Sequence, residues 1–286
     1  MRKSINQCIS RVGPKARQAS LTIPDFNTSV LDRGAGDGMF QAGDGTFEGC
    51  MKLSVDQLNR LKAAMLDTGS LEGVAAFGQP SANAIIADKY RWPKGVLKYQ
   101  LASRLSSKEK SLVRTTLRNL QTKLTSCIRF VESSSGNRIN VINNGGGCWS
   151  YIGYQSQALQ DLSLQSGGCM SAGIIEHEFL HALGIFHHQS RSDRDRYVRI
   201  LWQNIPENRK RNFHKYDSTV INHYGLPYDF TSVMHYGSTA FGIGGRTTIQ
   251  TLDPSKQRKI GQRGGVSAGD IELLRRHYNC PAAGGR

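Results

Sequence analysis

The segment from His177 to His187, which reads HEFLHALGIFH, constrains this chain more than any other. On a helix, His177 and His181 lie four residues apart, so both rings project from one face. Gly184 can adopt a left-handed backbone that ends the helix and turns the chain, which would bring His187 back as a third nitrogen ligand. The pattern therefore predicts a zinc site. Three nitrogen ligands leave one zinc position open for water, as a catalytic site requires and a structural site does not.

Glu178 directly follows the first of these histidines and is placed to accept a proton from a water molecule at the open position. A bare H-E-x-x-H occurs by chance, but the added glycine and third histidine at fixed spacing make a chance match far rarer. The alternative is a helix that carries surface histidines. Downstream, Ser232 to Tyr236 reads SVMHY, and a methionine turn after an elongated zinc motif is typical of metzincin endopeptidases. This second element favours the zinc site.

Together these motifs resemble those of the astacin family of zinc endopeptidases. The segments that carry the resemblance are 177–198, 232–236, 260–263 and 278–280. It covers about residues 82 to 280 as a catalytic domain, and a looser resemblance covers part of the preceding pro-region. It implies an α+β fold of two lobes with the zinc helix at the cleft between them, preceded by a partly irregular pro-region. We therefore expect a pro-region over 1–81 and a catalytic domain over 82–286.

The resemblance also implies roles for single residues. One Zn²⁺ per chain would be held by the three histidines, with Glu178 as general base. In the family, a tyrosine two residues after the methionine ligates the resting zinc and then stabilises the oxyanion, and Tyr236 occupies that place. Without the resemblance, Tyr236 would read equally well as a core aromatic. Met234 is expected to form a hydrophobic floor beneath the metal, because thioethers suit softer metals.

The pro-region departs from the family pattern at Phe47-Glu48-Gly49-Cys50. The family usually ends this motif in an aspartate whose carboxylate blocks the zinc. A Cys50 thiolate would be a better zinc ligand than a carboxylate, so we expect Cys50 to bind the metal in the latent form. The alternatives are a disulfide between Cys8 and Cys50 or an unpaired thiol.

A second departure follows the third ligand, where the family normally has glutamate and this chain has His188. In the family that glutamate meets the newly freed N-terminus of the mature enzyme. A neutral imidazole can accept a hydrogen bond but cannot form the ion pair, so propeptide removal and ordering of the site need not be linked here. Residues 78–82 also lack a basic residue for a trypsin-like activating enzyme.

Cysteine usage indicates an oxidising compartment. Four of the six cysteines fall in the expected catalytic domain, enough for two disulfides, and spacing alone leaves their connectivity open. The resemblance implies the pairs Cys127–Cys280 and Cys148–Cys169, and it implies secretion. The N-terminus has no apolar stretch typical of a signal peptide, so we expect a truncated or misassigned start. The sequon Asn27-Thr28-Ser29 is consistent with a secreted protein.

The net charge of +15 is carried almost entirely by the second part of the chain. Residues 1–81 contain nine Lys/Arg and eight Asp/Glu, whereas the remainder contains 28 and 14. No compact basic run and no nucleic-acid motif accompanies this charge, so we expect no nucleic-acid partner and attribute the charge to solubility and steering. Binding of a polyanion is the alternative. No stretch approaches the ~20 apolar residues of a membrane span, and we expect a monomer.

Periodicity and capping signals place these motifs on secondary structure. Expected elements are a helix over 54–66, a strand over 95–101, a helix that starts at the Ser106 and Glu109 capping box, strands over 138–142 and near 162–164, a zinc helix over 174–183, and a last helix over 267–278 within a mostly irregular C-terminal part. Residues 147–151, with Cys148, Trp149 and Ser150, resemble the family's edge strand, which pairs with extended peptide substrates. The activity expected is therefore endopeptidase. The alternative is an inactive binding protein that keeps the fold, and the presence of Glu178 argues against it.

Overall fold

The structure is a computed structural model that describes residues 50–57, 59, 84–124, 127–144, 146–216 and 220–281. Several expectations fall outside these ranges: the motif residues 47–49, Cys8, the sequon at 27–29, and the stretch 78–82. Of the helix expected over 54–66, residues 55–57 and 59 are helical, Ser54 is not, and residues 58 and 60–66 lie outside the described ranges.

A six-stranded sheet is the framework of the first half of the molecule, with strand order β1-β6-β7-β5-β3-β4. All neighbouring strands are parallel except the antiparallel pair β6 and β7. The strands are β1 (Cys50–Lys52), β3 (Val96–Leu101), β4 (Arg129–Glu132), β5 (Arg138–Ile142), β6 (Cys148–Tyr151) and β7 (Leu159–Leu164). The strands expected over 95–101, 138–142, 147–151 and 162–164 are confirmed, whereas β4 was not anticipated.

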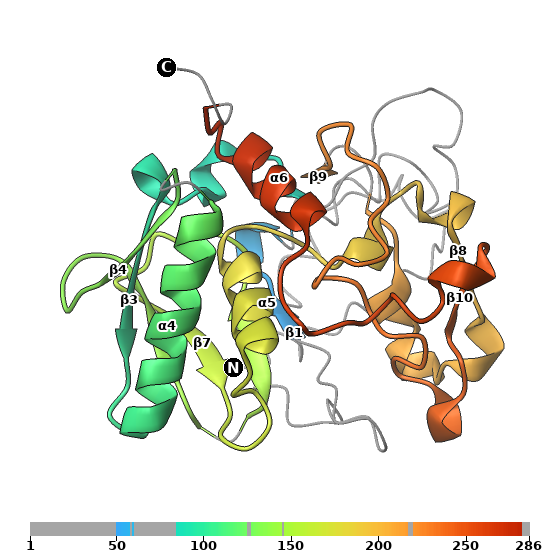
Figure 1. The fold of residues 1–286 in the computed structure, drawn as a ribbon, viewed down its shortest axis with the longest axis horizontal. Coiled ribbons are helices and arrows are strands. Elements are labelled where there is room, and N and C mark those ends of the chain that lie inside the picture. The colour runs from blue at the N-terminus through green and yellow to red at the C-terminus, as the bar shows by residue number, and fades with distance from the viewer. Residues whose placement is uncertain are drawn as a thin grey trace, which may run out of the picture.

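Two helices, α4 (Ser107–Lys123) and α5 (Ala172–Ala182), lie on the same side of this sheet (Figure 1). The expected capping box starts α4, because the Ser106 hydroxyl accepts from the Glu109 amide while the Glu109 carboxylate accepts from the Ser106 amide. α4 buries a single stripe toward the sheet. In contrast, α5 is buried at nearly every position, so it runs through the interior.

The second half of the molecule, on the right in Figure 1, has little regular structure. Its strands β8 (Val198–Ile200) and β10 (Ile249–Thr251) form one small sheet, and β2 (Ala84–Ile85) and β9 (Ile221–Asn222) form another. The helix α6 (Ala268–His277) returns the chain to the first half and begins at the Ser267 capping box. The 3-10 helices are η2 (Asp88–Tyr90), η3 (Pro93–Gly95), η4 (His188–Ser190), η5 (Arg194–Arg196), η6 (Trp202–Asn204), η7 (Glu207–Phe213), η8 (Ile243–Gly245) and η9 (Pro254–Lys256). The C-terminal part is therefore mostly irregular, as expected, but the small sheets were not predicted.

Each half has its own hydrophobic core. The larger core joins the sheet to α4, α5 and α6, and the smaller one gathers aromatic and aliphatic residues between 198 and 260. Both disulfides implied by the resemblance are present: Cys127–Cys280 joins the end of the chain to the first half, and Cys148–Cys169 joins β6 to the segment before α5. Among the described residues, no helix is both long and apolar enough to cross a bilayer. The last turn of α5 belongs to the larger core, and Phe186, just beyond it, packs in a third, small cluster with Ile85, Tyr90, Ile152 and Ile221.

Candidate metal centre

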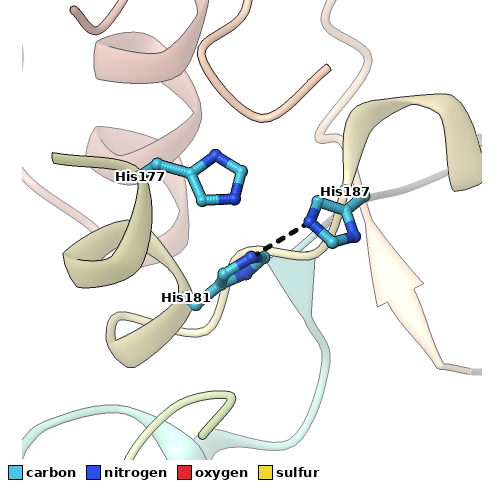
Figure 2. A group of neighbouring side chains, drawn as sticks. All are labelled: His177, His181 and His187. Atoms are coloured by element: carbon cyan, nitrogen blue, oxygen red, sulfur yellow. Dashed lines mark hydrogen bonds between the residues drawn. The ribbon is translucent and has the colours of Figure 1, made fainter. Parts of the chain in front are cut away.

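The side chains of His177, His181 and His187 converge on one point (Figure 2). All three are buried, and their candidate ligand nitrogens lie within 4.8 Å of one another. The Nε2 atoms of His181 and His187 are 3.2 Å apart. Two nitrogens bound tetrahedrally to zinc at 2.0–2.1 Å would be separated by about 3.3 Å. The spacing of the three rings therefore fits one zinc ion, as the sequence predicted.

Backbone carbonyls fix the orientation of two of the rings. His177 Nδ1 lies 2.8 Å from the carbonyl oxygen of Val233, and His181 Nδ1 lies 2.7 Å from that of Ile185. Because a carbonyl can only accept, each Nδ1 carries the proton and each Nε2 keeps its lone pair for a metal. Among the described residues, His177 Nε2 is buried and has no hydrogen-bond partner. An ion at this point would supply the partner that the protein lacks.

Gly184 makes the turn that returns His187 to the site. It has a φ of +100°, and its amide donates to the carbonyl of His181 while the amide of Ile185 donates to that of Leu180. These two bonds form a Schellman ending of α5. A Cβ at Gly184 would meet Ile85 at 2.9 Å and His277 at 3.0 Å, so a side chain is excluded by space as well as by backbone conformation. The same turn presents the Ile185 carbonyl to His181.

Burial holds the ligand histidines neutral. It lowers the pKa of His177 and His187 well below the ordinary value and lowers that of His181 to about 3. Metal ligation needs the unprotonated imidazole, so the environment favours the binding form. Burial also raises the pKa of Glu178, and both of its carboxylate oxygens are buried without a hydrogen-bond partner among the described residues. The site thus combines three neutral nitrogen ligands with the Glu178 carboxyl group, which forms no hydrogen bond to the described residues.

The methionine turn is anchored by the first turn of α6. The Asp270 carboxylate accepts hydrogen bonds from Ser232 Oγ at 2.6 Å, from the Val233 amide at 2.9 Å and from the Ser267 amide at 3.0 Å. Burial raises the pKa of Asp270 to about 6. Because the Val233 carbonyl in turn accepts from His177, α6 positions a metal ligand through two hydrogen bonds. The sequence identified Asp270 only as a helix cap, and no local pattern indicates its second partner. Met234 is buried in the larger core.

Tyr236 lies beside the third ligand. Its ring centroid is 4.5 Å from that of His187, and its side chain is buried against Phe213 and Phe241. Its backbone amide donates to the Gln189 side chain at 3.2 Å. A hydrogen bond therefore fixes its backbone, while the neighbouring aromatic rings fix its side chain. The structure therefore brings Tyr236 next to the metal ligands, and its catalytic role remains a prediction.

His188 fills the place of the family's glutamate as a buried neutral residue. Its Nε2 accepts from the Asp229 amide at 2.9 Å, and its ring packs 4.7 Å from that of Tyr228. Burial lowers the pKa of His188 well below its usual value. The imidazole thus accepts a hydrogen bond, as expected for the neutral form, but from a backbone amide. The other histidines outside the ligand set, namely His214, His223, His235 and His277, are buried or partly buried and have no ligand spacing.

The predicted substrate strand β6 is paired on both sides. β7 lies on one side, and β1 lies on the other in parallel register, with Cys50 opposite Trp149 and Lys52 opposite Tyr151. The pairing places the Cys50 backbone on β6, but its side chain is outside the described part, so zinc ligation by Cys50 stays a prediction. The pairing of residues 50–52 with β6 had no signal in the sequence.

Comparisons with known proteins agree with this geometry. The model of the Astacin peptidase family matches residues 84–279. The chain is 39% identical over 201 residues to human meprin A subunit beta and 37% identical over 241 residues to blastula protease 10 of Paracentrotus lividus, covering 70% and 82% of this chain. It spans only 28% and 38% of those two proteins. The solved structure of high choriolytic enzyme 1, a hatching enzyme zinc-protease from Oryzias latipes, superposes with a TM-score of 0.64 at 40% identity, covering 70% of this chain and all of that one.

A buried histidine behind the turn at Gly184 predicts how stability depends on pH. Burial lowers the pKa of His277 to about 3, whereas an unfolded histidine titrates near 6.5. Between these values the unfolded state binds a proton that the folded state does not, so stability falls as pH decreases from about 6.5 toward 3. His277→Phe should reduce the slope of unfolding free energy against pH in this window by up to about 1.4 kcal/mol per pH unit. Urea denaturation at several pH values measures the slope.

Tyr224→Phe, which removes the hydroxyl beside His277 Nδ1 but no titrating imidazole, serves as control. Equal slopes for wild type and His277→Phe would contradict the assignment.

Proposed function

The chain belongs to the astacin family of zinc metalloendopeptidases, and we propose that it is made as a latent, secreted proenzyme in which residues 1–81 restrain a catalytic domain over 82–286. The zinc site of three histidines is intact, so the activity is hydrolysis of peptide bonds. The observation that carries the catalytic assignment is the convergence of three neutral imidazoles, next to a Glu178 carboxyl group that has no hydrogen-bond partner among the described residues.

Glu178 is assigned as the general base. When bound at the three histidines, zinc acidifies a water molecule and polarises the scissile carbonyl. Glu178 follows the first ligand on α5 and offers two buried oxygens that have no hydrogen-bond partner among the described residues. A raised pKa suits a group that must take up a proton during each turnover. Its position and chemistry therefore fit the proton acceptor.

Tyr236 is assigned to stabilise charge on the oxyanion. Its ring packs against that of His187, and its backbone is fixed by Gln189. A phenol held in this way can donate a hydrogen bond to charge that develops in the transition state, at no cost in reorganisation.

Latency is supported by the way the segment 50–57 is held on the catalytic domain. β1 pairs with β6, the strand that a peptide substrate would use. Beyond the strand, the Ile152 amide donates to the Lys52 carbonyl at 3.0 Å, and the Gln57 side chain donates to the Ile152 carbonyl at 2.7 Å. Asp56 accepts from Lys89 at 2.6 Å and also from the Tyr90 hydroxyl. A substrate can pair with β6 only after this segment has left.

Secretion is supported by the two disulfides, which persist in oxidising compartments. The partner expected is a peptide or protein substrate cleaved by a monomer. The rival function is an inactive binding protein that keeps the fold, and the complete ligand set with Glu178 argues against it. Zinc content measured together with peptide hydrolysis separates the two. Retention on heparin that falls steeply with salt would instead support a polyanion-binding role for the basic domain.

Replacement of the general base is the first test. Glu178→Gln should retain zinc and the fold but reduce kcat by roughly 10²- to 10⁴-fold, since the ligands stay while proton transfer is lost. Zinc content by atomic absorption and hydrolysis of a fluorogenic peptide provide the measurements. Glu176→Gln is a matched control, because that carboxylate is on the same helix but pairs with Lys123 and the Val266 amide. Substantial activity in a clean Glu178→Gln preparation would refute the assignment.

Removal of the Tyr236 hydroxyl is the second test. Tyr236→Phe should lower kcat by roughly 10²-fold or more and leave KM nearly unchanged, because the phenol acts on the transition state. Steady-state kinetics on one peptide measure both constants. Tyr228→Phe is the control, because it removes another buried phenol, which bonds to His235 rather than facing the ligands. If Tyr236→Phe turns over like the wild type, Tyr236 is a core aromatic.

The role of Cys50 is tested on the uncleaved chain. If its thiolate fills the open zinc position, a thiol-modifying mercurial should activate the proenzyme without cleavage, and Cys50→Ser should be partly active, because a neutral hydroxyl is a poor zinc ligand. Cys8→Ser should change nothing, which separates this mechanism from a disulfide between Cys8 and Cys50. X-ray absorption of the proenzyme provides the direct check. A zinc shell of nitrogen and oxygen alone, with no sulfur near ~2.3 Å, would rule out Cys50 and leave the peptidase assignment intact.

A further inference from the structure

Lys52, the last residue of β1, is buried in the catalytic domain even though it carries a charge. The residue is only 8% exposed. The Nζ atom lies 3.4 Å from the centroid of the Trp149 ring and 5.8 Å from that of Tyr151. The two rings are 6.2 Å apart and nearly perpendicular. An ammonium group is costly to bury unless its environment stabilises the charge, and an aromatic face within about 6 Å does so.

The two rings occupy the face of the sheet that the helices leave uncovered. Cys148 belongs to the core beneath α4 and α5, and side chains alternate along a strand. Trp149 and Tyr151 therefore project from the opposite face.

Any strand that pairs with β6 meets the same surface. Residues directly opposed on neighbouring strands share a face of the sheet, whether the strands are parallel or antiparallel. Lys52 lies opposite Tyr151 in the register of β1 and β6. A substrate strand on β6 would therefore place one of its own side chains where Lys52 now lies, whichever way it runs.

We propose that Trp149 and Tyr151 form a substrate subsite selective for a cationic side chain, lysine or arginine, and that Lys52 fills this subsite in the uncleaved chain. The inference rests on the proposed function, because it takes β6 as the strand that binds substrate and β1 as its occupant before activation. It adds a preference that backbone pairing alone does not provide. The proenzyme would then inhibit itself by presenting a side chain that the enzyme selects.

The first experiment compares paired peptides on the activated enzyme, obtained from the full chain. Lysine is scanned through every position around the scissile bond, and each peptide is matched by one with norleucine at the same position, which keeps most of the stem but has no charge. At one position we expect kcat/KM to favour lysine by roughly 3- to 30-fold, the range of a desolvated cation–π contact. Trp149→Leu should bring the ratio close to one, and Trp149→Phe should retain part of it. A merely structural effect would lower both peptides together and leave the ratio unchanged.

The second experiment uses the uncleaved chain. Lys52→Met should increase its residual peptidase activity, while Lys52→Arg, which keeps a cation, should remain as latent as the wild type. Equal increases for both variants would show that the charge of Lys52 has no role. An active enzyme that cleaves the lysine and norleucine peptides equally at every position would overturn the subsite and leave the endopeptidase assignment standing. If zinc-loaded, activated protein hydrolyses no peptide, the proposed function fails and the subsite fails with it.

Discussion

Three imidazole rings can share one metal ion only if each presents an unprotonated nitrogen to the same point. In this structure, burial of the rings and hydrogen bonds to two backbone carbonyls meet that requirement. Burial removes the competing proton, and the carbonyls of Val233 and Ile185 fix which nitrogen of His177 and His181 remains free. These two carbonyls come from different parts of the fold. One belongs to the methionine turn held by α6, and the other to the turn that ends α5. The metal centre therefore depends on two turns that are far apart in the sequence, since displacement of either turn would rotate a ligand ring.

The sequence predicted the parts of this site that depend on local spacing. The separation of His177 and His181, the left-handed Gly184 and the return of His187 all follow from helix geometry and from one helix ending. The capping boxes at Ser106 and Ser267 were predictable for the same reason. Interactions between distant segments were not predictable. Asp270 reads as a helix cap, and only the folded chain shows that its carboxylate also anchors Val233. The pairing of β1 with β6 joins residues about a hundred positions apart and depends on backbone groups that every residue has.

His188 shows how a departure from a family pattern can be accommodated locally. A glutamate at this buried position would need a cationic partner, because an isolated buried carboxylate is costly. The neutral imidazole accepts one hydrogen bond from the Asp229 amide and fills the remaining space by packing against Tyr228. Described residues of the chain thus supply His188 with both a hydrogen bond and a packing partner. We therefore expect ordering of this region not to require a newly freed N-terminus.

If the chain is a proenzyme, as we propose, its activation depends on access of substrate to β6. The edge of a sheet is a template for any extended chain, because its free backbone groups pair with little regard to sequence. That property suits a peptidase with varied substrates, but it also gives the enzyme no means to distinguish a substrate from its own pro-region. Selectivity between peptides has to come from side chains along the edge. On β6 we assign this role to the rings of Trp149 and Tyr151, which lie two residues apart and share one face of the sheet. Under the proposed latency, a segment that covers β6 would block substrate best if it filled the proposed cationic subsite as well as pairing with the backbone of β6. Lys52 does both, since its carbonyl accepts from Ile152 while its ammonium group lies over Trp149.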